Sequence, residues 1–144
     1  MVNIPIQRLD PELPIPSRQH ESDAGYDLVT TVDLEIAPGQ RMLVPTGVAI
    51  GIPVGYAGFV QPRSGLAIKD GVTVLNTPGL IDSGYRGEIK VVLMNTDARA
   101  TFMAKRGDRI AQLVIQRVEQ VSWYVVDQLD DSDRGAGGHG STGR

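Results

Sequence analysis

Five short segments of the chain combine residue types that bind phosphate with single acidic side chains. They are AGYDL at 24–28, PRSGLA at 62–67, GLIDSGYRGE at 79–88, GDRIAQL at 107–113 and RGAGGHGSTG at 134–143. Glycine lets an anion approach the backbone closely, and arginine and hydroxyl groups donate hydrogen bonds to phosphate oxygens. An aspartate among such groups can orient and deprotonate a water molecule. The segments therefore indicate a site for a phosphorylated compound.

The second segment could form a turn that binds phosphate. Ser64 is a preferred N-cap residue, and Asp70 followed by Gly71 is a helix stop signal, so the pattern predicts a helical turn between them. Its first backbone N–H groups would face an anion, and Gly65 would let that anion come close. An ordinary capped turn without a ligand explains the same residues, and the segment alone does not decide between the two.

The third segment places an acid, Asp82, and an aromatic ring, Tyr85, among turn-forming residues. This pattern indicates a shaped pocket, although a hairpin with a solvated aspartate fits equally well. Just upstream, the amide of Asn76 could match the donor and acceptor edge of a pyrimidine, or it could be a plain turn residue. Lys90 follows on a predicted strand, where a surface lysine is the simplest interpretation.

The elements that position these segments are predicted to be short strands. Seventeen glycines and nine prolines interrupt the chain too often for long helices. Runs rich in β-branched residues predict strands, which indicates an all-β sandwich, barrel or jelly roll with one short helix. The strand candidates are 4–9, 42–44, 48–50, 57–61, 72–75, 88–94 and 109–118, with weaker ones at 24–28 and 123–126.

The chain is predicted to be one β domain over residues 1–129, followed by a mobile glycine-rich tail over residues 130–144. The tail contains no residues that could anchor a core. A length of 144 residues is enough for one hydrophobic core.

Composition excludes several other classes of protein. A net charge of -3 argues against broad binding to nucleic acid or to a membrane surface. The chain has no cysteine and only two histidines, His20 and His139, which argues against a dedicated zinc site. No apolar run is long enough to span a membrane and no signal-peptide pattern starts the chain, so we expect a cytoplasmic protein.

In their order and spacing, the five segments resemble the five motifs of the trimeric dUTPase family, bacterial type. The resemblance covers nearly the whole chain. It implies a distorted jelly-roll fold of the β-clip type, a homotrimer with active sites shared between subunits, and magnesium as cofactor. The implied reaction is hydrolysis of dUTP to dUMP and pyrophosphate. That reaction limits uracil incorporation into DNA and supplies dUMP for thymidylate synthesis.

The resemblance also implies a role for individual residues. Asp82 would be the general base, and Asp27 would act on magnesium indirectly, through water, with the ion held mainly by substrate phosphates. The tail would close over the nucleotide. The remaining substrate-binding residues would be Arg63, Ser64, Gly65, Asn76, Leu80, Ile81, Tyr85, Lys90, Gln112, Arg134, His139, Gly140 and Ser141.

One residue departs from the family pattern. His139 stands where most members carry a phenylalanine that stacks on the base. An imidazole can still stack, but it offers less apolar area and gains a charge as the pH falls. The departure therefore predicts weaker or pH-sensitive closure of the tail.

Three other functions compete with the dUTPase hypothesis. A dCTP deaminase shares the fold and part of the third segment, but Tyr85 and the full tail follow the triphosphatase pattern. A regulatory module that binds nucleotide without turnover would keep the same residues. A plain β-sandwich interaction domain would require five coincidental motifs.

Overall fold

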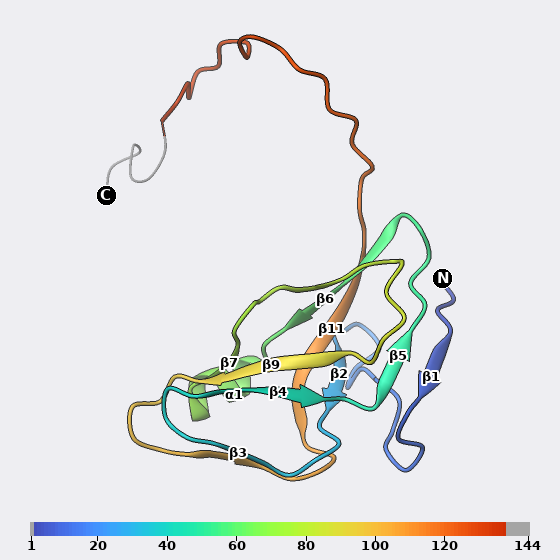
Figure 1. Cartoon of the computed structure of the whole chain (residues 1–144), viewed down its shortest axis with the longest axis vertical. Helices are drawn as coiled ribbons and strands as arrows, with labels where there is room; N and C mark the ends of the chain where they lie inside the picture. Colours follow the sequence, from blue (N-terminus) through green and yellow to red (C-terminus); the bar gives the residue numbers. More distant parts are fainter. Residues whose placement is uncertain (1, 138–144) are drawn as a thin grey trace.

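Short antiparallel strands make up almost all the regular structure within residues 2–137, the part of the chain that the computed structural model describes. This part contains eleven strands and one helix, most of which are labelled in Figure 1. In chain order they are β1 Ile6–Arg8, β2 Tyr26–Val29, β3 Leu34–Ile36, β4 Arg41–Pro45, β5 Val48–Ile50, β6 Tyr56–Gln61, α1 Ser64–Asp70, β7 Val72–Val74, β8 Gly79–Ile81, β9 Lys90–Asn95, β10 Phe102–Ala104 and β11 Arg109–Arg117.

The strands form four small antiparallel sheets. The largest has the order β2-β11-β6-β8, and a second has the order β4-β9-β7. Two pairs, β1 with β5 and β10 with β3, complete the arrangement. Most neighbours in these sheets are distant in sequence, so the fold is held by pairings between remote segments. The all-β prediction is therefore confirmed, with α1 as the helix.

The core lies where the sheets face one another. Along β9, Val91, Leu93 and Asn95 are buried, whereas the residues between them are only half-buried, as expected when alternate side chains of a strand point to opposite faces. The one buried amide in this row is fully paired. The Nδ2 atom of Asn95 donates to the carbonyls of Ile36 and Ala100 at 2.9 and 2.8 Å.

The seven main strand predictions are confirmed, with ends shifted by at most two residues, and the weaker one at 24–28 corresponds to β2. The prediction of a strand at 123–126 is wrong, because these residues have no strand pairing and Trp123 is 90% exposed. A β-rich composition cannot form a strand without a neighbour that pairs with it. Three strands were not predicted: β3, β8 and β10.

The short helix was predicted in the right place, but its cap was predicted wrongly. The N-cap is Arg63, in an extended conformation, and no side chain caps the helix. Ser64 is instead the first helical residue. The C-terminal stop is as predicted, because Gly71 adopts a left-handed conformation with φ of 65°. No helix within residues 2–137 is long and apolar enough to cross a membrane.

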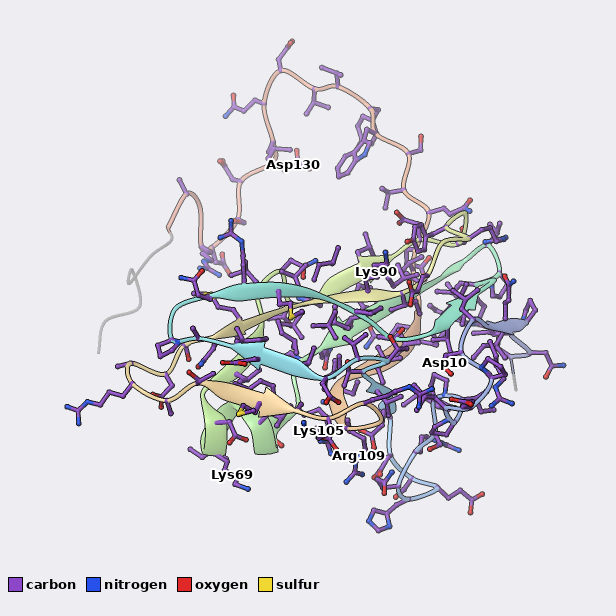
Figure 2. The ribbon with its side chains drawn as sticks, turned by 60° about the horizontal axis from the view of Figure 1, so that its bottom comes forward. Asp10, Lys69, Lys90, Lys105, Arg109 and Asp130 are labelled. Carbon is purple, nitrogen blue, oxygen red and sulfur yellow. The ribbon has the colours of Figure 1, made fainter. Side chains whose placement is uncertain are left out.

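Beyond β11 the described chain leaves the body as an arm, residues 118–137. In Figure 1 the arm extends away from the sheets, and in Figure 2 Asp130 stands apart from them. Its apolar side chains are largely exposed, including Tyr124 at 86% and Val125 at 99%. The regular structure thus ends at Arg117, twelve residues before the predicted boundary at 129.

Candidate functional site

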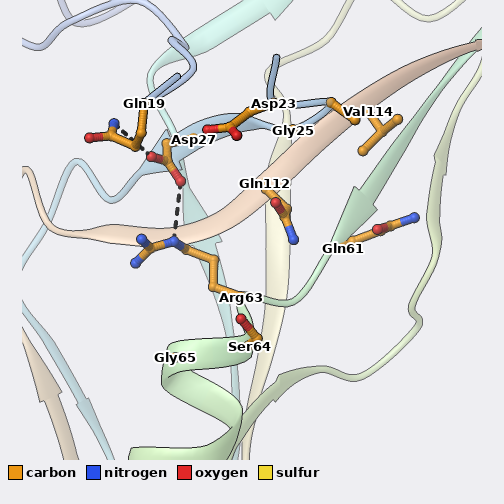
Figure 3. Close-up of a pocket in the computed structure, with 11 residues that line it drawn as sticks. Gln19, Asp23, Gly25, Asp27, Gln61, Arg63, Ser64, Gly65, Gln112 and Val114 are labelled. Carbon is orange, nitrogen blue, oxygen red and sulfur yellow. Dashed lines mark hydrogen bonds and ion pairs between the residues drawn. The ribbon is translucent and has the colours of Figure 1, made fainter. Parts of the chain in front are cut away.

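A row of three polar side chains crosses the largest sheet. Gln112 on β11 pairs with Asp27 on β2 and with Gln61 on β6, so all three side chains point to the same face. They line a polar hollow of about 450 Å³ at the start of α1 (Figure 3). The pairing register of the three strands therefore brings these side chains together in the hollow. Its lining consists of Gln19, Asp23, Ala24, Gly25, Asp27, Gln61, Arg63, Ser64, Gly65, Gln112 and Val114.

Asp27 is the centre of charge in the polar hollow. One carboxylate oxygen lies 3.1 Å from Nε of Arg63, and the other lies 3.2 Å from Nη1 of Arg109. The second oxygen also accepts a hydrogen bond of 3.0 Å from Gln19 (Figure 3). Asp27 thus contacts two guanidinium groups, and one of them, that of Arg63, lines the hollow, where it can also donate to an anion.

Gln112 is held by its surroundings. Its Nε2 donates to the carbonyl of Pro62 at 3.0 Å, which leaves a second amide hydrogen for another acceptor. The amide lies over Gly25, where an added Cβ would come within 2.4 Å of Oε1. Donation from Gln112 to a phosphate oxygen remains a prediction that this geometry permits.

The start of α1 is open to ligand. Ser64 and Gly65 are exposed, and a Cβ added at Gly65 would meet no atom within 4 Å. The backbone of Gly65 is therefore accessible from the polar hollow, although the serine does not cap the helix.

A second, more apolar hollow of about 330 Å³ contains the predicted base. It brings Asp82 together with Asn76, Tyr85 and Lys90, which come from the β7–β8 connection, the loop after β8, and β9. Leu80 and Ile81, two more predicted binding residues, lie on β8 itself. The full lining is Leu43, Val60, Val74, Asn76, Gly79, Leu80, Ile81, Asp82, Tyr85, Glu88, Lys90 and Val91.

The loop that carries Asp82 and Tyr85 is braced by its own hydrogen bonds. The backbone N–H of Tyr85 donates to the carbonyl of Asp82 at 3.1 Å, and its hydroxyl donates to the carbonyl of Glu88 at 2.9 Å. Arg86 donates to the carbonyls of Ser83 and Tyr85, both at 2.7 Å. These contacts give a short glycine-containing loop a defined shape.

The two hollows share no lining residue. Val60 lines the apolar hollow, whereas the next residue on β6, Gln61, lines the polar one. Since successive residues of a strand point to opposite faces, the sheet separates the two hollows within one chain. The predicted base and the predicted phosphate-binding residues therefore do not meet in a single copy.

Arg134 lies in the arm, where its Nε donates to the carbonyl of Gly137 at 2.9 Å, and it lines neither hollow. The predicted roles of His139, Gly140 and Ser141 lie outside the described residues. Sequence reasoning missed Gln19, Gln61 and Arg109. Arg109 stands in the fourth segment but was not singled out, and Gln61 becomes visible only through its register with Gln112.

Two carboxylates, Asp23 and Asp27, line the polar hollow. Among residues 2–137 no cluster of three or more histidine, cysteine, aspartate or glutamate side chains could hold a metal ion. A magnesium ion keeps several waters and binds substrate phosphates, so a site with so few protein ligands fits this ion in the company of a phosphorylated ligand.

The fold and the two hollows define an all-β domain with one pocket suited to an anion and another that combines apolar walls with an aspartate. The family model of dUTPase matches residues 11–143. The chain belongs to the dUTPase family.

Similar proteins support this membership along the whole chain. The chain is 59% identical to deoxyuridine 5'-triphosphate nucleotidohydrolase of Nocardia farcinica over 140 residues, covering 97% of this chain and 85% of that protein. It is 60% identical to the same enzyme of Thermobifida fusca over 142 residues, covering 99% and 79%. All-β architecture and sequence thus point to the same family.

A solved structure agrees with the fold. The dUTPase of Staphylococcus bacteriophage 80alpha with dUpNHpp is 27% identical, covers 100% of both chains and superposes with a TM-score of 0.90. A dUTPase mutant from phage phi11 of S. aureus, 27% identical with a TM-score of 0.80, covers 88% of this chain and 98% of that chain, and it coordinates a structural Mg(II) ion.

Proposed function

We propose that the chain hydrolyses dUTP to dUMP and pyrophosphate with magnesium as cofactor, in the cytoplasm. The observation that carries the proposal is the apolar hollow, in which the carboxylate of Asp82 lies beside Asn76 and Tyr85. Family membership and relatives named deoxyuridine 5'-triphosphate nucleotidohydrolase support the substrate.

The apolar hollow would hold the nucleoside. Asn76 would form hydrogen bonds with the uracil edge. Cytosine has an amino donor where uracil has an acceptor, so a donor of the protein would face it without a hydrogen bond. Leu80 and Ile81 would line the base, and the ring of Tyr85 would lie against the deoxyribose, where a ribose 2′-hydroxyl would find no hydrogen-bond partner. Lys90, whose Nζ lies 3.7 Å from Oε2 of Glu88, adds a positive charge to the lining of the apolar hollow.

Asp82 would orient and deprotonate the water that attacks the α-phosphorus, with pyrophosphate as leaving group. Arg63, Ser64, Gly65 and Gln112 would hold the phosphate chain. Magnesium supplies charge neutralisation at the phosphate oxygens when bound, and Asp27 would hold its water ligands. Closure of the tail, residues 130–144, would bring Arg134, His139, Gly140 and Ser141 to the nucleotide and exclude bulk water.

A complete site would then need more than one copy of the chain. The apolar hollow with Asp82 and the polar hollow lie on different sides of β6. Arg63 and Gln112 of a neighbouring copy would therefore contact a nucleotide bound in the apolar hollow. We propose a homotrimer with shared sites. Light scattering tests the assembly, and a mass near the 15.5 kDa of one chain would contradict it.

A complementation assay tests the sharing directly. Asp82→Asn and Arg63→Ala each damage a different half of the site. If the halves come from different subunits, mixed oligomers of the two inactive variants contain some intact sites and recover activity. No recovery in oligomers shown by mass spectrometry to be mixed would place both residues in the same subunit's site.

The reaction itself is tested by product analysis. Purified protein with magnesium is offered dUTP, dCTP, dTTP and UTP separately, and the products are separated by chromatography. Conversion of dUTP alone, to dUMP and pyrophosphate, and its arrest by a chelator are the expected results. Deamination of dCTP would favour the related deaminases, and binding without conversion would favour a regulatory module.

A further inference from the structure

The aromatic ring of Tyr85 rests on a position that has no side chain. An added Cβ at Gly87 would come within 2.5 Å of the phenolic oxygen, 2.7 Å of Cζ and 3.1 Å of Cε2. Contacts below 3.0 Å essentially never occur for a real Cβ atom. The ring can therefore adopt its observed position only while residue 87 is glycine.

A hydrogen bond holds the outer end of the same ring. The Tyr85 hydroxyl donates to the carbonyl of Glu88 at 2.9 Å. Glu88 is itself anchored, because its carboxylate accepts a hydrogen bond of 2.9 Å from the backbone N–H of Gly47. Tyr85 is 44% exposed, so few other contacts would keep its ring in one orientation.

The position of this ring sets the shape of the apolar hollow, which Tyr85 lines together with Asn76 and Asp82. A ring moved off Gly87 would either enter the hollow or swing into solvent. In both cases the wall that would face the sugar changes, while Asn76 and Asp82 remain in place.

We propose that Gly87 is a positioning residue that seats the Tyr85 ring and thereby sets the preference for deoxyribose over ribose nucleotides. This inference rests on the proposed hydrolysis of dUTP. Gly87 touches no substrate in this account, since its effect passes entirely through the tyrosine.

The substitution Gly87→Ala isolates this effect. Residue 87 is exposed and its backbone is not among the positive-φ glycines, so an alanine there strains no dihedral angle. The atoms that it meets belong to the free end of a side chain, so the ring moves rather than the fold. A displacement of roughly 1 Å in a positioned group can cost about 100-fold in rate.

The test measures kcat and KM for dUTP and UTP in wild type, Gly87→Ala and Gly84→Ala. Gly84 is the matched control, because it lies in the same loop and an added Cβ there meets nothing within 4 Å. For Gly87→Ala we expect KM for dUTP to rise about 10-fold or more and the dUTP-to-UTP ratio of kcat/KM to fall by at least about 10-fold. Gly84→Ala keeps both values.

A double substitution separates positioning from a general structural role. Once the ring is removed by Tyr85→Ala, adding Gly87→Ala should change neither KM nor the ratio further. Independent, additive losses would overturn the inference, and so would a wild-type ratio in Gly87→Ala. A wild-type protein that fails to hydrolyse dUTP would instead refute the proposed function on which the inference rests.

Discussion

Arg63 and Asp27 form an ion pair, with Nε and Oδ1 3.1 Å apart, between two residues that family resemblance assigns to phosphate and to magnesium. Each group therefore already has a partner before a nucleotide arrives. A phosphate chain that carries a metal ion can replace both partners of this ion pair. The phosphate would bind the guanidinium of Arg63, and the metal with its waters would interact with the carboxylate of Asp27. Binding of metal and of phosphate should consequently be coupled.

Asp27→Asn should raise the magnesium concentration needed for half-maximal turnover by about 10-fold or more, since supporting groups around a metal typically contribute 10–100-fold to its affinity. The measurement is a magnesium titration of turnover at fixed dUTP. Asp33→Asn makes the same charge change at an exposed site outside both hollows and should leave the titration curve in place. An unchanged curve for Asp27→Asn would remove this residue from the metal's surroundings.

Asp82→Asn should lower kcat by about 100-fold to 10,000-fold, the usual contribution of a general base. The amide keeps the shape of the side chain but cannot accept the proton from water. Calorimetry with the analogue dUpNHpp should show retained binding. An undiminished rate would exclude Asp82 as the base.

Gly25→Ala should displace the amide of Gln112, because an added Cβ would lie 2.4 Å from Oε1 and 3.1 Å from Cδ. We expect KM for dUTP to rise by about 10-fold through a weakened phosphate contact, an effect of roughly 1.4 kcal/mol, close to the lower end of the range for one hydrogen bond to a charged group. Steady-state kinetics and a thermal melt check this, with Gly84→Ala as the control. A lower melting temperature with unaltered KM would assign Gly25 a role in packing alone.

Removal of all residues after Asp133 should leave the oligomer folded and turnover strongly reduced. The described contacts of residues 134–137 are local, such as the bond from Gly137 N–H to the carbonyl of Arg134 at 3.1 Å, so none of them supports the body. Thermal melting and light scattering should match the full chain while kcat falls. A truncated protein with full activity would show that the tail takes no part in catalysis.

Asp97 should contribute to stability at neutral pH but not in acid. Backbone N–H groups of Ala100 and Arg99 donate to its carboxylate, both at 2.7 Å, and hold the pKa of Asp97 below its ordinary value. A carboxyl group with a lowered folded-state pKa stabilises the fold above its unfolded pKa, and this stability is lost as the pH falls through the folded pKa. Urea denaturation should therefore show Asp97→Asn to be less stable than wild type near pH 7, with the difference shrinking below about pH 4. A difference independent of pH would contradict this origin.

Local sequence signals were sufficient for strands rich in β-branched residues, such as β5 and β11. They failed for β8, because the segment Gly79–Ile81 contains a glycine and reads as part of a loop. That strand exists because β6 offers it a pairing edge, which only the tertiary structure supplies. The weak strand signal at 123–126 failed for the opposite reason, since nothing within the described chain pairs with it.

In the candidate site, too, some features follow from local sequence and others only from the tertiary structure. Asp82 and Tyr85 could be placed near each other from their spacing, because three residues of one loop cannot separate far. The alignment of Asp27, Gln112 and Gln61 depends on the register of three strands that are distant in sequence. Spacing along the chain also gave no sign that β6 would divide the predicted residues between two hollows.

The exposed arm has a practical consequence for spectroscopy. Trp123 is the chain's single tryptophan, and it lies 90% exposed in a segment that leaves the body. An indole in water emits at long wavelength and is quenched by iodide, and both properties change when the ring is covered. The sequence thus carries its own fluorescent reporter, and its emission would report the proposed closure of the tail without interference from any other tryptophan.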